Sequence, residues 1–261
     1  MRIGVFDSGV GGLTVLAEAQ VQVQGADFVY YADTASVPYG DKPREVVRQC
    51  VFAGVECLVR QGIDALVVAC NTATSVAIED LRRAYAFPII GMEPAVKPAL
   101  ECQPGRVLVL ATDMTLREDK FQRLVHRIDD EARVDDLSLQ RLVAHAEAFE
   151  FDPELIGPTL REAFAPIDPA AYGAVVLGCT HFPYYRPQLA QLFAPGTLLV
   201  DGNRGTINNL CARLGDRLPG AGSGAVAYLE SGQAAAPGRF QRYLDRYRDI
   251  TAAEALRAPR R

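Results

Sequence analysis

Val-Val-Ala-Cys-Asn-Thr-Ala-Thr-Ser at residues 67–75 and Val-Val-Leu-Gly-Cys-Thr-His-Phe-Pro at residues 175–183 follow one pattern. Each is an apolar run that ends in a small residue, then a cysteine, then a polar cluster that contains threonine. Such runs are typical of buried parallel strands that deliver a side chain to the carboxyl end of a sheet. Ligands bind at this edge in open α/β sheets. Cys70 and Cys179 therefore predict a site with a thiol on each side of a substrate.

The two stretches belong to a longer repeat. One strand pattern ends at Asp7, before Cys70, and another ends at Thr112, at a similar distance before Cys179. Any α/β protein repeats strand-then-polar sequence to some degree, but the matched spacing favours duplication. Apolar strand patterns alternate with helical ones, which predicts βαβ units and parallel sheets. The strand patterns are at 2–6, 28–32, 64–69, 87–91, 106–111, 174–178 and 198–201, and helical patterns between them include 13–22, 74–85 and 116–128.

The predicted fold class is α/β, with two pseudo-symmetric parallel-sheet domains and the active site at their interface. The first domain is expected to be discontinuous, with residues 1–96 plus 205–261, and to carry Asp7 and Cys70. The second, residues 97–204, carries Cys179 and His181. The chain after residue 205, with a Gly-rich stretch at 219–224, is expected to return to the first domain.

Composition excludes several classes of protein. The 261 residues are 49% apolar and 23% charged, an ordinary globular balance. No apolar run reaches the roughly 18–20 residues of a membrane span. A net charge of −5 argues against nucleic acid as a partner. The N-terminus enters a strand pattern without a signal region, so a cytoplasmic location is expected. Arg257, Arg260 and Arg261 are expected to form a solvated tail.

Neither a metal nor a cofactor is expected. Six widely spaced cysteines without a C-x-x-C pair fit reduced thiols rather than a disulfide framework. Cys179 and His181 are too close in sequence for the usual zinc-ligand spacings. Pyridoxal phosphate needs a Schiff-base lysine. None of the three lysines, at 42, 97 and 120, follows an apolar strand.

Polar neighbours distinguish the two cysteines from ordinary buried ones. A cysteine at a strand end is often a small buried hydrophobe. Here, however, amide and hydroxyl groups from Asn71, Thr72 and Thr180 follow the thiols, and His181 could exchange a proton near neutral pH. The segment Asp7-Ser-Gly-Val-Gly-Gly12 lies between a strand and a helix, where glycines and a helix N-terminus favour an anion.

Five segments, in order, resemble the glutamate racemases of the aspartate/glutamate racemase superfamily. They are Phe-Asp-Ser-Gly-Val-Gly-Gly (6–12), Val-Pro-Tyr-Gly (37–40), Ala-Cys-Asn-Thr (69–72), Gly-Met-Glu-Pro-Ala (91–95) and Leu-Gly-Cys-Thr-His-Phe-Pro (177–183). Each segment alone is modest, whereas the ordered set is specific. The resemblance implies a cofactor-independent isomerase that interconverts L- and D-glutamate, supplies D-glutamate for peptidoglycan and thus cell shape, and forms a homodimer.

The resemblance also implies roles for individual residues. Cys179 would act on L-glutamate, assisted by His181, and Cys70 on D-glutamate, assisted by Asp7. Racemisation removes the Cα proton from one face and returns a proton to the other, and a thiol of ordinary pKa, about 8.5, can serve in either form. The matching substrate-binding positions are Asp7, Ser8, Tyr39, Gly40, Asn71, Thr72, Thr180 and His181, with Thr112, Thr115 and Glu147 as weaker candidates.

Two departures from the family pattern leave questions open. Asp33-Thr-Ala-Ser36 stands where the family often has Asp-x-x-Arg, and Ala148 replaces a glycine after Glu147. Both bear on loop geometry, and the second on the role of Glu147. Three other functions stay open: racemisation of aspartate or another amino acid, acyl transfer or hydrolysis with Cys179 as nucleophile and His181 as base, and anion binding without catalysis.

Overall fold

The computed structural model describes residues 1–103, 105–129, 132–218 and 222–257. Part of the Gly-rich stretch, residues 219–221, lies outside the described residues. Two of the three arginines of the predicted tail, Arg260 and Arg261, also lie outside them, as does the side chain of Arg257.

The described strands form two sheets. The first has the order β10-β9-β2-β1-β3-β4 and the second β6-β5-β7-β8. Neighbouring strands are parallel except β10, which is antiparallel to β9. The strands are β1 (Arg2–Asp7), β2 (Asp27–Ala32), β3 (Ala65–Val68), β4 (Ile89–Gly91), β5 (Arg106–Ala111), β6 (Val134–Ser138), β7 (Tyr172–Leu177), β8 (Leu198–Asp201), β9 (Val226–Glu230) and β10 (Gln233–Ala234).

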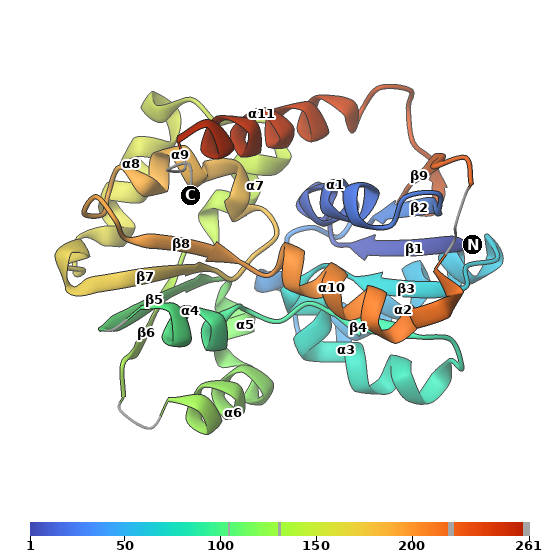
Figure 1. Ribbon diagram of the computed structural model, residues 1–261, viewed down its shortest axis with the longest axis horizontal. Coiled ribbons are helices and arrows are strands. Elements are labelled where there is room, and N and C mark those ends of the chain that lie inside the picture. The colour runs from blue at the N-terminus through green and yellow to red at the C-terminus, as the bar shows by residue number, and fades with distance from the viewer. Residues whose placement is uncertain (104, 130–131, 219–221, 258–261) are drawn as a thin grey trace.

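Both sheets repeat one strand order. In each half the first strand lies between the second and the third, and the fourth lies beyond the third. The strand before each cysteine, β3 or β7, therefore pairs with the first strand of its half. Figure 1 shows the arrowheads of β1 and β8 pointing toward the middle of the molecule, so the carboxyl ends of the two sheets face one another. The predicted class, two pseudo-symmetric α/β halves with parallel sheets, is confirmed.

Helices cover both faces of each sheet. On the first sheet, α1 and α10 cover one face, and α2 and α3 cover the other. α4 and α6 pack on one face of the second sheet, and α7 and α8 on the opposite face. The helices are α1 (Leu13–Gln22), α2 (Arg44–Arg60), α3 (Asn71–Ala84), α4 (Val96–Cys102), α5 (Asp113–Arg117), α6 (Asp119–Ile128), α7 (Arg141–Glu147), α8 (Pro153–Phe164), α9 (Arg186–Ala190), α10 (Asn203–Leu214) and α11 (Gln241–Arg257).

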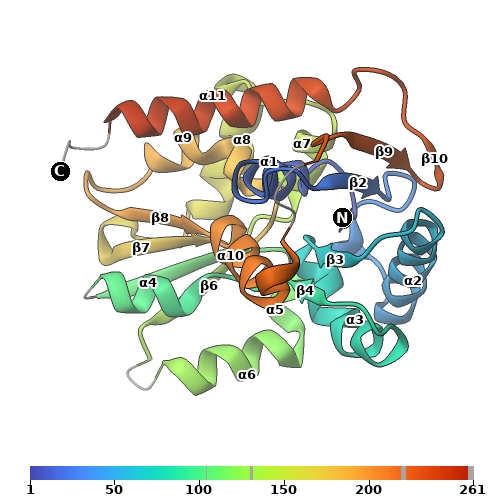
Figure 2. The same cartoon turned by 45° about the vertical axis from the view of Figure 1, so that its right-hand side comes forward.

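One apolar cluster continues from the first half into the second. It joins residues on the buried face of α1, such as Leu16, to residues on the buried faces of α7 and α8, such as Leu142 and Leu160. Helix α11 lies over both halves, from the side of β9 and β10 toward α9 (Figures 1 and 2). Its Tyr243 hydroxyl donates to the Glu147 carbonyl at 2.9 Å. This shared packing holds the two sheets together.

Three predicted elements differ from the structure. The helix predicted at 74–85 begins already at Asn71, because the Cys70 side chain caps it. The helix predicted at 116–128 is two helices, α5 and α6, with extended backbone at Glu118 between them. Strand β9 was not predicted; it pairs with β2 and brings the chain after residue 205 back to the first sheet. The domain boundaries at 96/97 and 204/205 stay a prediction. None of the helices in the described ranges is both long and apolar enough to cross a membrane.

Gly54 lets α2 lie close against the first sheet. A β-carbon there would lie 2.5 Å from Cε2 of Phe6 and 2.7 Å from Cε1 of Tyr31. Gly54→Ala should lower the free energy of unfolding by about 1–3 kcal/mol through overpacking. Gly205 in α10 has open space at the same point, so Gly205→Ala should raise it by about 0.5–1 kcal/mol. Urea denaturation measures both, and a stabilised Gly54→Ala variant would contradict this packing.

Candidate active site

The predicted site residues come from strand ends that meet between the sheets. Asp7 ends β1, Cys70 follows β3 by two residues, and Cys179 follows β7 by two residues. The Thr180 hydroxyl donates to Oδ2 of Asp7 at 3.1 Å, which joins the second half to the first. Both cysteines are buried, and they line one pocket. The expected arrangement, a thiol from each half, is present.

Cys70 lies in an environment that favours its neutral thiol. Its Sγ accepts from the Ala73 amide at 3.4 Å and lies 3.6 Å from the Ser8 hydroxyl. Burial raises the pKa of Cys70 to about 12, and the nearby charge of Asp7 adds to this rise. Cys70 therefore holds its proton at neutral pH in the absence of a ligand.

Cys179 lies beside a different group, an imidazole. Its Sγ is 3.6 Å from Nδ1 of His181, and Nε2 of the same ring is 2.7 Å from Oε1 of Glu147. Burial alone would lower the pKa of His181, but the hydrogen bonds and charges of Cys179 and Glu147 outweigh it and raise that pKa well above 6.5. A protonated His181 stabilises negative charge on the adjacent sulfur.

Glu147 connects the halves as well as orienting His181. Its Oε1 also accepts from the amide of Val10 at 2.8 Å, in the loop after β1. A β-carbon on Gly9 would lie only 1.7 Å from this oxygen, so the glycine makes the close approach possible. Ala148, which replaces the family's glycine, has φ −80°, a backbone conformation that any residue adopts. Alanine is therefore accommodated after Glu147 without backbone strain.

Asp7 carries a fully buried carboxyl group, which lies where the half with Cys70 meets the half with Cys179. Its Oδ1 accepts from the Gly9 amide at 3.0 Å, in addition to the bond from Thr180. Burial raises the pKa of Asp7 to about 6, with Glu147 adding to the rise and His181 opposing it. Asp7 can therefore gain or lose a proton close to neutral pH.

Hydroxyl groups gather at one side of the pocket. The Oγ1 atoms of Thr72 and Thr112 lie 2.9 Å apart, those of Thr72 and Thr115 3.2 Å, and those of Thr112 and Thr115 2.9 Å. Thr72 belongs to α3 of the first half, and the other two belong to the start of α5 in the second. The two weaker candidates thus join a predicted site residue in one cluster of donors.

The pocket brings together most of the predicted residues. Asn71 lines it with both side-chain amide atoms buried and, among the described residues, without a hydrogen-bond partner. Tyr39 and Gly40 reach it through a loop in which the Tyr39 hydroxyl donates to Oδ2 of Asp33 at 2.7 Å, so Asp33 anchors that loop. The lining residues are Ser8, Pro38, Tyr39, Gly40, Cys70, Asn71, Thr72, Thr112, Gln140, Val143, Cys179, Thr180 and His181.

The sequence did not point to Gln140 or Val143. Gln140 lies just before α7 and Val143 within it, and neither was among the residues that the motifs marked as candidates. Asp7, Thr115 and Glu147 lie behind the pocket wall, in contact with lining residues rather than among them. The cavity that the lining residues enclose has room for about one water molecule. The walls must therefore separate before an amino acid can be admitted.

Asp7→Asn should change how stability depends on pH. The folded chain holds the Asp7 proton up to about pH 6, whereas the unfolded chain releases it near 3.8. Stability therefore falls as pH rises through this window, by about 3 kcal/mol if Asp7 alone is counted. At pH 7.5 the variant should unfold at a higher urea concentration than wild type, whereas at pH 4 it should not. An equal difference in stability at both pH values would contradict the raised pKa, because it would mean that folding does not change the pKa of Asp7.

Comparisons with known proteins agree with this geometry. A family model described as Asp/Glu/Hydantoin racemase matches residues 15–210. The chain is 50% identical over 254 residues to a glutamate racemase of Halothermothrix orenii (96% of this chain, 98% of that one). It is 48% identical over 236 residues to glutamate racemase 2 of Bacillus subtilis (89% of each chain).

A solved structure supports the same conclusion. Glutamate racemase of Escherichia coli, in complex with L-glutamate and the activator UDP-MurNAc-Ala, superposes with a TM-score of 0.82 at 32% identity and 94% coverage of each chain. A match this long, with relatives this similar, leaves one assignment: the chain belongs to the Asp/Glu/Hydantoin racemase family and, within it, to the glutamate racemases.

Proposed function

We propose that this chain interconverts L- and D-glutamate by proton transfer at Cα between two thiols, without a cofactor. The observation that carries the proposal is the pair of buried cysteines, one from each half, in a single pocket. A planar carbanion between them can lose a proton to one side and gain one from the other. A single base would have to cross the substrate or exchange with solvent.

The surroundings of the thiols suggest the starting state. Cys70 is a neutral thiol, because burial raises its pKa to about 12. For the reaction of L-glutamate, Cys179 would act as the base, beside His181, whose raised pKa favours the imidazolium form that stabilises negative charge on the sulfur. With L-glutamate bound, the Cys179 thiolate takes the Cα proton and becomes a thiol. The Cys70 thiol then gives its proton to the opposite face of Cα, which leaves a thiolate on Cys70 and D-glutamate in the pocket.

The reverse direction uses the complementary state. D-glutamate loses its Cα proton to the Cys70 thiolate, and the Cys179 thiol supplies the new one. Asp7, whose pKa is about 6, assists by gaining or losing a proton as the charge on Cys70 changes. Its own contacts are with Gly9 and Thr180, so it acts through charge rather than by a bond to the sulfur. The two thiols thus exchange roles with each turnover.

Hydrogen-bond donors would stabilise the charge that develops on the substrate carboxylate. The carbanion at Cα delocalises into that carboxylate, so donors aimed at it lower the barrier. The hydroxyls of Thr72 and Thr112 and the amide of Asn71 line the pocket, and Thr72 lies in the first turn of α3, whose N-terminus favours negative charge. Thr180 and Ser8 complete the polar wall near the thiols.

One observation favours a second function. Cys179, His181 and Glu147 are linked in the order thiol, imidazole, carboxylate, the arrangement used for nucleophilic acyl transfer. That function would form a thioester on Cys179 and would leave Cys70 dispensable. Racemisation of aspartate in place of glutamate is a third outcome, because it requires the same thiols and a shallower pocket.

Two cysteine variants separate these functions. We expect wild type, without pyridoxal phosphate, to remove the optical activity of L-glutamate in D2O while deuterium replaces the Cα proton. Cys70→Ser and Cys179→Ser should each lower this rate by at least about 100-fold, because a serine hydroxyl is a far weaker acid than a thiol. Polarimetry and proton NMR follow the two signals together. Cys102→Ser is the matched control, because Cys102 is exposed and lies outside the pocket.

Other results would redirect the assignment. Full racemisation by Cys70→Ser would overturn the two-thiol mechanism, and a wild type that racemises no amino acid would favour acyl transfer. Exchange with aspartate but not glutamate would keep the mechanism and change the substrate. We further infer that the chain acts as a cytoplasmic homodimer and supplies D-glutamate for peptidoglycan. Added D-glutamate should then restore growth and cell shape to a strain that depends on this chain and from which the chain has been removed.

A further inference from the structure

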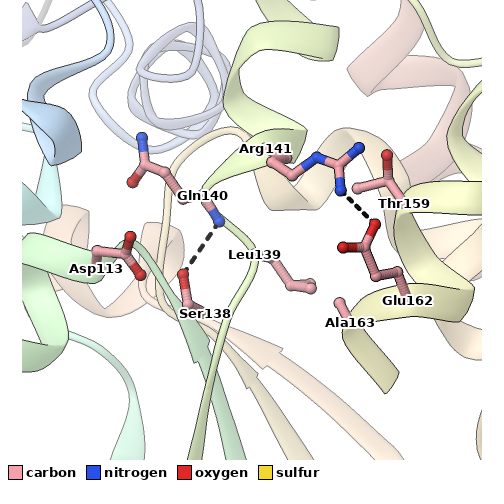
Figure 3. Close-up of a pocket in the computed structure, with 8 residues that line it drawn as sticks. All are labelled: Asp113, Ser138, Leu139, Gln140, Arg141, Thr159, Glu162 and Ala163. Carbon is pink, nitrogen blue, oxygen red and sulfur yellow. Dashed lines mark hydrogen bonds and ion pairs between the residues drawn. The ribbon is translucent and has the colours of Figure 1, made fainter. Parts of the chain in front are cut away.

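Gln140 contributes a buried, unpartnered amide to the wall of the catalytic pocket. Its side-chain nitrogen and oxygen are both shielded from solvent, and neither has a hydrogen-bond partner among the described residues. Its backbone amide, in contrast, donates to the Ser138 hydroxyl at 3.3 Å. Figure 3 shows the Gln140 side chain directed away from Arg141, Thr159 and Glu162. The backbone is thus fixed while the amide is left available.

An amide in this state costs stability. A buried donor or acceptor without a partner costs about 1–3 kcal/mol, so a buried glutamine ordinarily has one. Gln188 differs from Gln140 in that its Nε2 donates to the Phe151 carbonyl at 2.9 Å, so only its Oε1 is without a partner among the described residues. Asn71, in the same pocket as Gln140, is unpartnered as well. Two such amides in one small pocket indicate a ligand that supplies the missing hydrogen bonds.

None of the described residues that line the pocket is a lysine or an arginine that could bind a carboxylate. Its lining contains neutral donors and one ionisable cation, His181, which is already bonded to Cys179 and Glu147. Glutamate carries two carboxylates, so each must be held by hydroxyl, amide or backbone N–H groups. A carboxylate accepts several such bonds, and the terminal amide of Gln140 has two hydrogens to give.

The position of Gln140 indicates which carboxylate it meets. The thiols fix Cα at the strand ends, and the hydroxyl cluster of Thr72, Thr112 and Thr115 lies beside α3. Gln140 is on another wall, against the Tyr39–Gly40 loop: a β-carbon on Gly40 would lie 1.9 Å from its Oε1. The same residue also lines an outer cavity of about 300 Å³, drawn in Figure 3, which the cysteines do not reach. Gln140 therefore faces the part of the substrate that points away from the thiols.

We propose that Gln140 binds the side-chain carboxylate of glutamate through Nε2 and so helps to select this substrate. The proposal rests on the proposed glutamate racemisation. Rotation of the terminal amide exchanges Nε2 and Oε1, so either assignment of the two atoms can present the donor. A contact to the distal carboxylate is equally strong in the ground state and in the transition state, because the charge there does not change during proton transfer.

Gln140→Leu tests this role with one substitution of similar volume. We expect the KM for L-glutamate to rise about 10–100-fold, the loss typical of a hydrogen bond to a charged group, with kcat nearly unchanged. Thermal unfolding should occur at the same temperature or higher, because the variant removes an unpartnered buried amide. Gln188→Leu is the matched control: it should unfold at a lower temperature and keep the wild-type KM.

A second variant keeps the test decisive. Gln140→Glu preserves the shape but places a carboxylate opposite the substrate's own, so the KM should rise further than in Gln140→Leu. An unchanged KM in both variants, or a fall in kcat at constant KM, would overturn the proposal. Loss of stability in Gln140→Leu would instead show a structural role. If wild type does not racemise glutamate, the proposed function is wrong, and this result is distinct from any result with the Gln140 variants.

Discussion

The structure depends on the contact between the carboxyl ends of two parallel sheets. Hydrogen bonds span that contact: Thr180 donates to Asp7, and Glu147, which also orients His181, accepts from Val10. Because the sheets repeat one strand order, their equivalent strands deliver equivalent cysteines to the same place. The two halves thus bring two thiols to one pocket, an arrangement that neither half provides alone.

Equivalent positions do not give equivalent chemistry. Cys70 caps a helix and is buried, and this burial, with the nearby charge of Asp7 adding to it, keeps the thiol protonated. Cys179 lies beside His181, whose other nitrogen is held by Glu147. The asymmetry suits a reaction that needs an acid and a base at once. It also explains why polar groups gather where an apolar core would otherwise be favoured, since each one sets the charge of a neighbour.

The sequence predicted the strand ends well, because buried parallel strands are apolar and their carboxyl ends carry the polar residues. Cys70, Cys179, Asp7 and His181 were all placed by that rule. It failed where tertiary contacts decide the local structure. Cys70 starts α3 three residues early through its sulfur, and β9 forms only because β2 lies beside it. No sequence pattern marked Gln140. It stands out because its buried side-chain amide has no hydrogen-bond partner among the described residues, which only the packed structure reveals.

The central claim is that one cysteine is an acid and the other a base. The most direct test is to measure the protonation states of Cys70 and Cys179 near neutral pH. Carbon-13 NMR of protein labelled at the cysteine β-carbons, assigned with Cys70→Ser, would follow each thiol from pH 6 to 10. We expect the Cys70 signal to stay that of a neutral thiol throughout this range, since the pKa of Cys70 is about 12. A thiolate signal for Cys70 at pH 8 would contradict it, because the two cysteines would then lack the division into acid and base on which the mechanism depends.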